Sequence, residues 1–553
     1  MDFKYTRYGL TKKEKVLERL LEIVPGGLSW LILIGMIVLS FTKPLLAAVI
    51  IIAFILYWLL RMIYMNILLI FSYTRFKIEK NTNWMERVEK IDGLDFIHKK
   101  TGIQKKRSGW RSRISEIIHR RQLENLVKSG SRPPKSEDIS HVVIIPVVKE
   151  PQEIVEPGLL AIKNGSYPPE RILLVIALEE RACETVRQDM FKLAEKYKTA
   201  FLDLLVVPHP SDLPGEARVK GANTTFAARK VEKYLQEKKI PYENVIASCF
   251  DADTVPVADY FSCLTYHFMI TPNRTQSSFQ PIPVYFNNIW NVPGFARIID
   301  IGTSFFQLVE ATNPKKLITF SSHSTSFKSL ADMDYWPTDL VSDDSAIFWK
   351  ALLHYEGDYQ TIPIPVAVSM DIVVGKSVKD TIINIYKQKR RWAWGVENFP
   401  IVMRGFLRTK KLSFYRKISY TFKFIDKFTS WATWSFLLTF ISWLPTLFAS
   451  KEFATTTIYY TAPRIRATIF ALASFCLMVC ILTSMLLLPP EKSKYPLLKK
   501  FMHAGEWLFI PVVVLVLSAL PALDAQTRLM FGKYMEFWVT DKYRLKTKET
   551  SSD

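Results

Sequence analysis

The feature that most constrains this chain is the placement of its apolar residues, which gather in charge-poor runs near both ends. Residues 27–42 and 44–60 form two such runs with only Lys43 between them, and three more lie at 428–449, 467–488 and 505–520. Runs of this length predict helices that cross a membrane, the first two as a hairpin. The chain between them is long enough for a soluble domain. We therefore expect a soluble domain held between membrane segments.

A formal net charge of +21 is compatible with binding to nucleic acid or with a membrane setting. The basic residues do not form one stripe with interleaved aromatic residues, which argues against nucleic acid as a partner. They cluster beside the apolar runs, as Lys12, Lys13 and Lys15, as Arg75, Lys77 and Lys80, and as Arg408, Lys410 and Lys411. This pattern predicts an integral protein of the plasma (inner) membrane, in contact with anionic lipids, with its N-terminus and central domain in the cytoplasm.

The composition along the chain predicts five segments. They are an N-terminal segment with the transmembrane hairpin (1–72), a basic connector (73–140), an α/β domain (141–377), interfacial helices (378–427) and a C-terminal transmembrane region with a tail (428–553). The connector reads equally well as an amphipathic surface segment or as a partly disordered linker. Five crossings would place the tail outside. The segment 505–527, which contains two prolines, is therefore expected to lie in the interface or to re-enter.

The central domain shows the texture of a parallel sheet. Short β-branched runs at 141–148, 171–178, 201–207 and 244–250 alternate with helix-compatible stretches at 151–164, 181–197 and 218–237. Continuous apolar strands alternating with helices indicate a parallel sheet that is covered on both faces. In such sheets ligands bind beyond the carboxyl ends of the strands, so the residues that follow each strand are the candidates for chemistry.

Two carboxylates follow the fourth predicted strand in the sequence Phe250-Asp251-Ala252-Asp253. Such a pair can share a hard cation, which would neutralise the charge on a departing diphosphate. Taken alone the motif is weak, and a solvated turn with an aspartate cap is the plainer interpretation.

A second acidic pair, Asp343-Asp344, follows Ser342 at the start of a helical stretch. Ser and Asp are good helix N-caps, so capping is one interpretation. The other is a general base that takes the proton from an attacking hydroxyl. The local sequence supports both equally.

A third element reads Gln388-Lys389-Arg390-Arg391-Trp392. Arg and Trp together can hold phosphate oxygens or stack on a sugar, and they are equally typical of a helix at a membrane surface. A fourth, Phe537-Trp538-Val539-Thr540-Asp541-Lys542, follows the last apolar run and is by itself only an aromatic, basic segment at a membrane edge.

These four elements, in this order, resemble the motifs of the processive family 2 glycosyltransferases, the cellulose synthase and hyaluronan synthase group. The resemblance implies an α/β cytoplasmic catalytic domain of the GT-A (Rossmann-like) fold, flanked by transmembrane α-helices. It implies that Asp251 and Asp253 hold Mg²⁺ or Mn²⁺ and that Asp344 is the catalytic base with Asp343 beside it. The resemblance also implies donor-site residues. They are Asp251 of the first motif and, at the third and fourth motifs, Gln388, Arg391, Trp392, Thr540 and Lys542.

Further stretches agree with the family, and two depart from it. Glu150 after the first strand and Lys220 in Lys220-Gly221-Ala222-Asn223 match its nucleotide-side segments, as do Phe279-Gln280-Pro281 and Tyr285–Trp290 near its acceptor site. Glu179 stands where the family has an aspartate for the base and ribose. Ser322–Thr325 replaces a glycine-containing segment, where His323 is expected to be a structural hydrogen-bonding residue.

The implied activity is inverting transfer of a sugar from a nucleotide-diphosphate donor, a UDP-sugar, to a growing polysaccharide. Two alternatives stay open: transfer of one sugar to a polyprenyl or glycolipid acceptor, and a catalytically inactive membrane scaffold or transporter. The sequence identifies no partner subunit.

Overall fold

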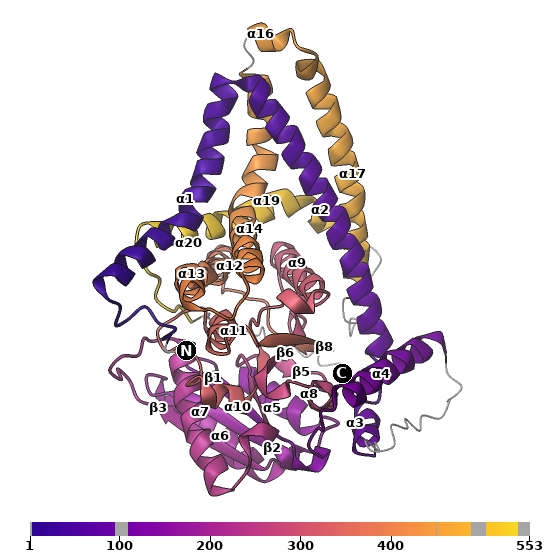
Figure 1. Cartoon of the computed structure of the whole chain (residues 1–553), viewed down its shortest axis with the longest axis vertical. Coiled ribbons are helices and arrows are strands. Elements are labelled where there is room, and N and C mark those ends of the chain that lie inside the picture. Colours follow the sequence, from indigo (N-terminus) through magenta and orange to yellow (C-terminus); the bar gives the residue numbers. More distant parts are fainter. Residues whose placement is uncertain (1–2, 94–108, 449–450, 488–504, 540–553) are drawn as a thin grey trace, which may run out of the picture.

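The computed structural model describes residues 3–93, 109–448, 451–487 and 505–539. It has two parts, an α/β domain and a set of long helices that rise from one side of that domain (Figure 1). The described N-terminal residues lie on the α/β domain before the chain enters the first long helix, α1 (Lys12–Thr42).

One half of the sheet is parallel, in the order β3-β2-β1-β4. Every residue of β2 is buried, and all but the first residue of β1 are buried, because helices cover both faces. The pattern of the sequence therefore predicted this half of the fold. The strands are β1 (Ser140–Val147), β2 (Ile172–Glu179), β3 (Asp203–His209) and β4 (Val245–Cys249), and the connecting helices are α5 (Gln152–Lys163), α6 (Glu184–Tyr197) and α7 (Lys220–Glu237).

The other half of the sheet is mixed and completes an eight-stranded order, β3-β2-β1-β4-β7-β6-β8-β5. Strand β7 runs antiparallel to β4 and pairs His323 with Cys249. This pairing brings the turn before β7 beside the residues that follow β4. The strands are β5 (Val255–Pro256), β6 (Ser277–Val284), β7 (His323–Ser326) and β8 (Gln360–Ser369). The sheet, with its neighbouring helices, confirms the expected α/β fold.

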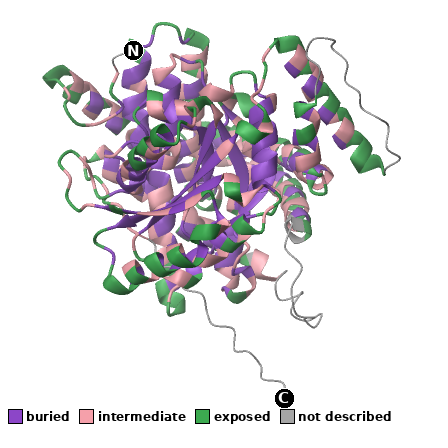
Figure 2. Ribbon diagram, turned by 90° about the horizontal axis from the view of Figure 1, so that it is seen from below, coloured by how far each residue is buried: buried purple, intermediate pink, exposed green. Residues whose placement is uncertain are grey.

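Alternate side chains of the strands enter two separate hydrophobic clusters, as the pleat of a sheet requires. Val142 and Ile144 pack in one cluster with α7 and α11 (Asp343–His354), whereas Val143 and Ile145 pack in the other with α5 and α8 (Tyr260–Ile270). The sheet is accordingly buried at the centre of the domain when viewed from below (Figure 2). The remaining helices of the domain are α9 (Gly294–Glu310) and α10 (Phe327–Asp332).

Two helices of the basic connector pack onto the domain. They are α3 (Trp84–Asp92) and α4 (Trp110–Ser129). Trp84, Val88 and Leu123 are at most 2% exposed and join the same cluster as Val143. The described parts of the connector thus contribute to the core, which a surface segment or a linker would not do.

Four helices within the described residues are long and apolar enough to cross a membrane: α1, α2 (Pro44–Glu79), Thr457–Thr483 within α17 (Thr457–Leu487) and Ile510–Met530. The run expected at 428–449 is not among them, because α14 (Phe414–Thr439) ends before the run does and the short α15 (Leu444–Leu447) follows. Even so, α14 rises beside α1 (Figure 1), and Phe448 stacks on Phe41 at the far end of α1, with ring centroids 4.1 Å apart.

The segment 505–530 runs across the feet of these helices, with α19 (Ile510–Val514), a π-helical turn and α20 (Leu520–Met530) (Figure 1). Both of its ends contact groups on the side of the α/β domain. Glu506 pairs with Arg297 of α9 at 2.9 Å, and the carbonyl of Leu529 accepts a hydrogen bond from Arg19, near the start of α1, at 2.9 Å. A crossing helix would place its ends on opposite sides. This geometry therefore favours the expected interfacial position over a fifth crossing.

Candidate active site

The carboxylates after β4 occupy different environments. Asp251 accepts hydrogen bonds from Lys220 Nζ at 2.9 Å and from Ser321 Oγ at 2.8 Å, and its side chain is 29% exposed. Asp253 is 3% exposed, and its Oδ2 accepts a hydrogen bond from the backbone N–H of Asp371 at 3.0 Å. Neither is the freely solvated aspartate of a simple turn. Asp251 is partly exposed, whereas Asp253 is buried.

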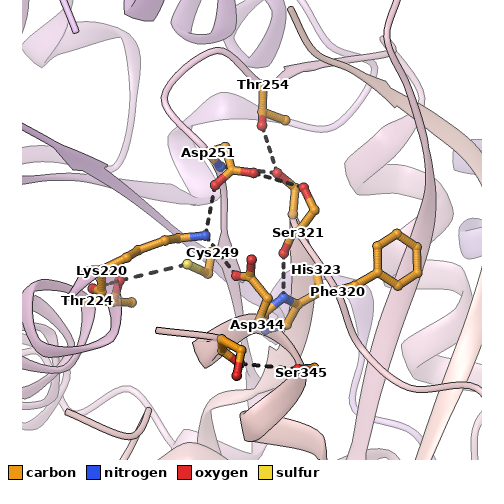
Figure 3. A network of polar contacts seen from close by, with 12 residues as sticks. Lys220, Thr224, Cys249, Asp251, Thr254, Phe320, Ser321, His323, Asp344 and Ser345 are labelled. Atoms are coloured by element: carbon orange, nitrogen blue, oxygen red, sulfur yellow. Dashed lines mark hydrogen bonds and ion pairs between the residues drawn. The ribbon is translucent and has the colours of Figure 1, made fainter. Parts of the chain in front are cut away.

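Lys220, the first residue of α7, connects the two acidic motifs (Figure 3). Its Nζ lies 2.9 Å from Asp251 Oδ1 and 2.8 Å from Asp344 Oδ1. Burial alone would lower the pKa of Lys220, but the two carboxylates raise that pKa well above its usual value, so the ammonium is retained. A Cβ on the next residue, Gly221, would lie 2.2 Å from the carbonyl oxygen of Pro337. Glycine is thus required for α7 to approach the acidic turn closely.

The acidic pair opens α11, but Ser342 does not cap this helix through its side chain. Its Oγ donates instead to Glu397 Oε1 at 2.7 Å. Asp343 is 2% exposed, and burial, followed by the neighbouring Asp344, raises the pKa of Asp343 well above its usual range. Asp344 is 29% exposed and faces Lys220. Of the two acids, Asp344 is the one exposed enough to meet a substrate.

The turn before β7 contributes Ser321, which the sequence analysis did not identify, and Ser322, which it named only as the start of a segment that departs from the family. Ser321 has φ of +48°, a left-handed conformation that is costly for a residue with a Cβ. Its neighbours are held by Gln280, which accepts from Phe320 N at 3.0 Å and donates to the carbonyl oxygens of Phe320 and Ser322. Ser322 Oγ accepts from the backbone N–H of Asp251 at 3.1 Å. The only sequence signal was the replacement of a glycine-containing segment here.

His323 is fully buried, and burial lowers its pKa below the usual value. Its Nδ1 lies 2.8 Å from the carbonyl oxygen of Ser321, so it supports the turn (Figure 3). This contact agrees with the structural role expected for His323.

Helix α12 (Val378–Ala393) carries Gln388, Arg391 and Trp392. The Trp392 ring lies 5.9 Å from the ring of Tyr285, and the Lys389 ammonium lies 3.8 Å from the centroid of Trp392. Lys389 is itself paired with the buried Asp300. Gln388 is 6% exposed, and its Oε1 accepts no hydrogen bond from the described residues.

Arg391 connects this helix to the C-terminal tail. Its guanidinium lies 5.0 Å from the ring centroid of Phe537 and donates to the carbonyl oxygen of Trp538 at 3.4 Å. The tail motif therefore reaches the α/β side of the molecule. Thr540 and Lys542, the two predicted phosphate contacts of the motif, lie outside the described residues.

The candidate nucleotide residues Glu150 and Glu179 lie at the carboxyl edge of the parallel strands, Glu150 after β1 and Glu179 as the last residue of β2. Glu150 accepts hydrogen bonds from the backbone N–H groups of Val148 and Lys149. Glu179 lies 3.6 Å from His209 Nδ1 and 3.4 Å from Arg181 Nε. His209 Nε2 is 3.0 Å from Glu216. Glu179, His209 and Glu216 thus form a second polar group at this edge.

Comparison with known proteins places residues 248–488 in the family described as "Glycosyl transferase family group 2". Poly-beta-1,6-N-acetyl-D-glucosamine synthase of Staphylococcus epidermidis is 25% identical over 270 residues, which cover 48% of this chain and 56% of that protein. The synthase of the same name from Staphylococcus aureus (strain COL) is 28% identical over 177 residues, covering 32% and 39%. The chain thus matches about half or less of the length of these relatives.

Among solved structures, the chain is similar to a mannosyltransferase of Pyrobaculum calidifontis in complex with GDP-Man and Mn²⁺, with a TM-score of 0.39 and 15% identity over 66% of this chain and 97% of that one. It is also similar to residues 1–349 of S. aureus TarS in complex with UDP, with a TM-score of 0.32 and 11% identity over 73% and 95%.

Proposed function

We propose that this chain, which belongs to the family 2 glycosyltransferases, transfers a sugar from a nucleotide-diphosphate donor to a growing polysaccharide at a membrane. The observation that carries the proposal is the contact of one buried ammonium, that of Lys220, with Asp251 and with Asp344. It joins the motif suited to the donor diphosphate with the motif suited to proton abstraction. A merely structural role would not require both acids to face the same open site.

Asp344 is the proposed general base. It accepts the proton of the acceptor hydroxyl as that oxygen attacks the anomeric carbon, and the bond from this carbon to the diphosphate oxygen breaks. A single displacement of this kind inverts the anomeric centre. Lys220 pairs with the Asp344 carboxylate at 2.8 Å and so holds it in place. Asp343, which is buried, supports the turn.

Asp251 and Asp253 are the proposed ligands of Mg²⁺ or Mn²⁺. Their donor set fits a hard divalent cation, since both supply carboxylate oxygens at the carboxyl end of β4. Among the described residues no group of three or more His, Cys, Asp or Glu side chains could hold a metal, so the remaining ligands would come from the donor diphosphate and water. When bound, the ion would supply positive charge to the departing diphosphate.

The other predicted residues have supporting roles in this proposal. Arg391 stabilises negative charge on the leaving group, and Trp392, backed by Lys389, forms a face of the acceptor site. Glu150, Glu179 and Gln388 bind the nucleotide side of the donor, and Thr540 and Lys542 of the tail contact its phosphates. The apolar helices beside the domain receive the product, with the domain on the cytoplasmic side of the plasma (inner) membrane.

The names of the relatives support a donor that carries N-acetylglucosamine, a UDP-sugar, and a β-linked polymer as product. An inverting enzyme would form a β-linkage from an α-linked donor of this kind. The relatives match only part of this chain, so the sugar is proposed together with the activity and is tested with it.

The test is donor turnover by the purified full-length chain in lipid bilayers. A panel of UDP- and GDP-sugars is offered with Mg²⁺ or Mn²⁺, and the released nucleoside diphosphate and the size of the product are measured. We expect release from UDP-N-acetylglucosamine, loss of release with a chelator, and a water-soluble polymer. Release with one added sugar in an organic extract would replace the polymer with a lipid-linked product. Donor binding without release, in folded protein, would contradict the enzymatic proposal.

A further inference from the structure

A buried acid just beyond the α12 motif holds the turn that carries the proposed base. Glu397 is 1% exposed. Its Oε1 accepts hydrogen bonds from the backbone N–H of Ser342 at 2.8 Å and from Ser342 Oγ at 2.7 Å. Ser342 directly precedes Asp343 and Asp344. The backbone at the start of α11 is therefore tied to a carboxylate of a different segment.

The second carboxylate oxygen of Glu397 contacts two other side chains. Its Oε2 accepts from Trp394 Nε1 at 2.8 Å and pairs with Arg7 Nη2 at 3.0 Å. Arg7 is the residue that supplies positive charge to this buried carboxylate. Because an uncompensated buried charge is costly, the ion pair with Arg7 helps to hold the Glu397 carboxylate in place.

Asn398 makes a parallel connection. Its Nδ2 donates to Ser342 Oγ at 2.8 Å, and its Oδ1 accepts a hydrogen bond from the Tyr5 hydroxyl at 2.7 Å. Asn398 is fully buried and Tyr5 is 5% exposed. Hydrogen bonds between buried groups fix geometry strongly, since breaking one leaves a polar atom without water.

Residues Tyr5–Arg7, which we term the N-terminal strap, lie just ahead of α1. Besides the contacts of Tyr5 and Arg7, the hydroxyl of Thr6 and the backbone N–H of Arg7 both donate to Asp339 Oδ2, at 2.6 and 3.0 Å. Asp339 lies on the loop that leads to Ser342. The strap thus contacts the loop just before the acidic turn, at Asp339, and reaches the turn itself through Glu397 and Asn398. A few residues later, at Lys12, the chain enters α1.

We propose that Glu397 and Asn398 are positioning residues for Asp344, and that the N-terminal strap completes this arrangement. A short segment next to the first membrane helix then determines how well the proposed base is aligned. The inference rests on the proposed role of Asp344. A proton acceptor must be held to within a fraction of an ångström of its productive position, so loosening the turn should lower the rate of transfer while leaving donor binding intact.

Kinetics of the full-length chain in lipid bilayers test the consequence. Tyr5→Phe deletes one hydroxyl, and Tyr8→Phe is the matched control because Tyr8 is 63% exposed. We expect Tyr5→Phe to lower kcat about fivefold, the loss of one buried hydrogen bond, with an unchanged donor KM. Glu397→Gln should lower kcat about 100-fold, because an amide nitrogen cannot accept the hydrogen bonds that one carboxylate oxygen now receives. Tyr8→Phe should match the wild type.

Hydrogen exchange tests the holding itself, without reference to activity. In Tyr5→Phe and Arg7→Gln we expect the amides of residues 342–346 to exchange about tenfold faster, while those of β2 keep their wild-type rates. Unchanged exchange at 342–346 in both variants would overturn the proposal. A wild-type kcat in a folded Glu397→Gln protein would also overturn the proposal. A variant that lost kcat, donor affinity and Tm together would indicate general destabilisation and would overturn it too. A wild-type protein that is inactive on every donor would count against the proposed function. The exchange rates would still show whether the N-terminal strap holds residues 342–346 in place.

Discussion

Two parts of the same sheet edge are built in contrasting ways. At the ends of β2 and β3, His209 pairs with both Glu179 and Glu216, and the sheet register itself places Glu179 opposite His209. At the end of β4, Asp251 and Asp344 share the ammonium of Lys220, although Lys220 and Asp344 are 124 residues apart. The first group follows from neighbouring strands, whereas the second depends on segments that only the complete domain brings together.

The contrast teaches where rearrangement is to be expected. In the group at β2 and β3, Glu179 and Glu216 pair with His209, and Glu179 also pairs with Arg181. We expect these pairs to persist when a ligand binds. In the cluster at β4, Lys220 pairs with an oxygen of Asp251, which is proposed to bind a metal ion, and with an oxygen of Asp344, which is proposed to accept a proton. We therefore expect donor binding to draw Lys220 away from at least one carboxylate, toward the phosphates. The following predictions test this difference, beginning with the largest expected effect.

The largest effect is expected for Asp344→Asn. An amide cannot accept the proton of the acceptor, so kcat should fall by about 10³-fold while the dissociation constant of the donor changes little. Donor turnover and calorimetric binding measure the two quantities. Asp212→Asn serves as the control, since the side chain of Asp212 is 67% exposed and pairs with Arg218 rather than with Lys220. Full turnover in a folded Asp344→Asn protein would remove Asp344 from the mechanism.

Lys220→Met should have the next largest effect. It leaves two carboxylates facing each other without their shared cation, which should lower Tm and reduce kcat/KM for the donor by about 100-fold. Lys233→Met, on an exposed position of the same helix, is the control. Thermal unfolding and initial rates are measured side by side. If only Tm changed, Lys220 would be a structural residue and the contrast between the two groups would weaken.

Ser321 separates the effect of a hydrogen bond from the effect of backbone strain. Ser321→Ala removes the donor to Asp251 but keeps a Cβ at φ of +48°. Ser321→Gly removes both the hydroxyl and the Cβ. We expect both variants to lose about three- to tenfold in kcat/KM, and the glycine variant to be the more stable by about 1 kcal/mol. Equal unfolding free energies would show that the turn is not strained.

The smallest effect concerns His209. Burial alone would lower its pKa, but Glu179 and Glu216, whose carboxylates accept from the protonated imidazole, raise that pKa above the usual value. The stabilisation is therefore complete below the unfolded pKa of about 6.5 and is lost as pH rises through the higher folded pKa. Tm should fall by about 1–2 °C more between pH 6 and pH 9 in the wild type than in His209→Gln. His354→Gln is the control, because burial lowers the pKa of His354 and its removal should not diminish this decline.

Much of the site could be predicted before the fold was known. The strands that end before Glu150, Glu179 and Asp251 were readable from short apolar runs, because a strand buried on both faces must be apolar throughout. The clustering of Lys220, Asp251 and Asp344 was implied only by the resemblance of motifs to a family. Glu397 carried just a faint signal, an acid within the largely apolar stretch Trp392–Pro400.

The sequence by itself determined the parallel half of the sheet, the residues at its carboxyl edge and the apolar helices, because each follows from a local period of apolar side chains. Only the tertiary structure decided the antiparallel pairing of β7 with β4, the left-handed Ser321 beside Asp251, and the strap that reaches Ser342 through Glu397. The tertiary structure also placed both ends of the segment 505–530 on the α/β side of the long helices. These features join residues far apart in the chain, and their energies come from pairings that no local pattern records.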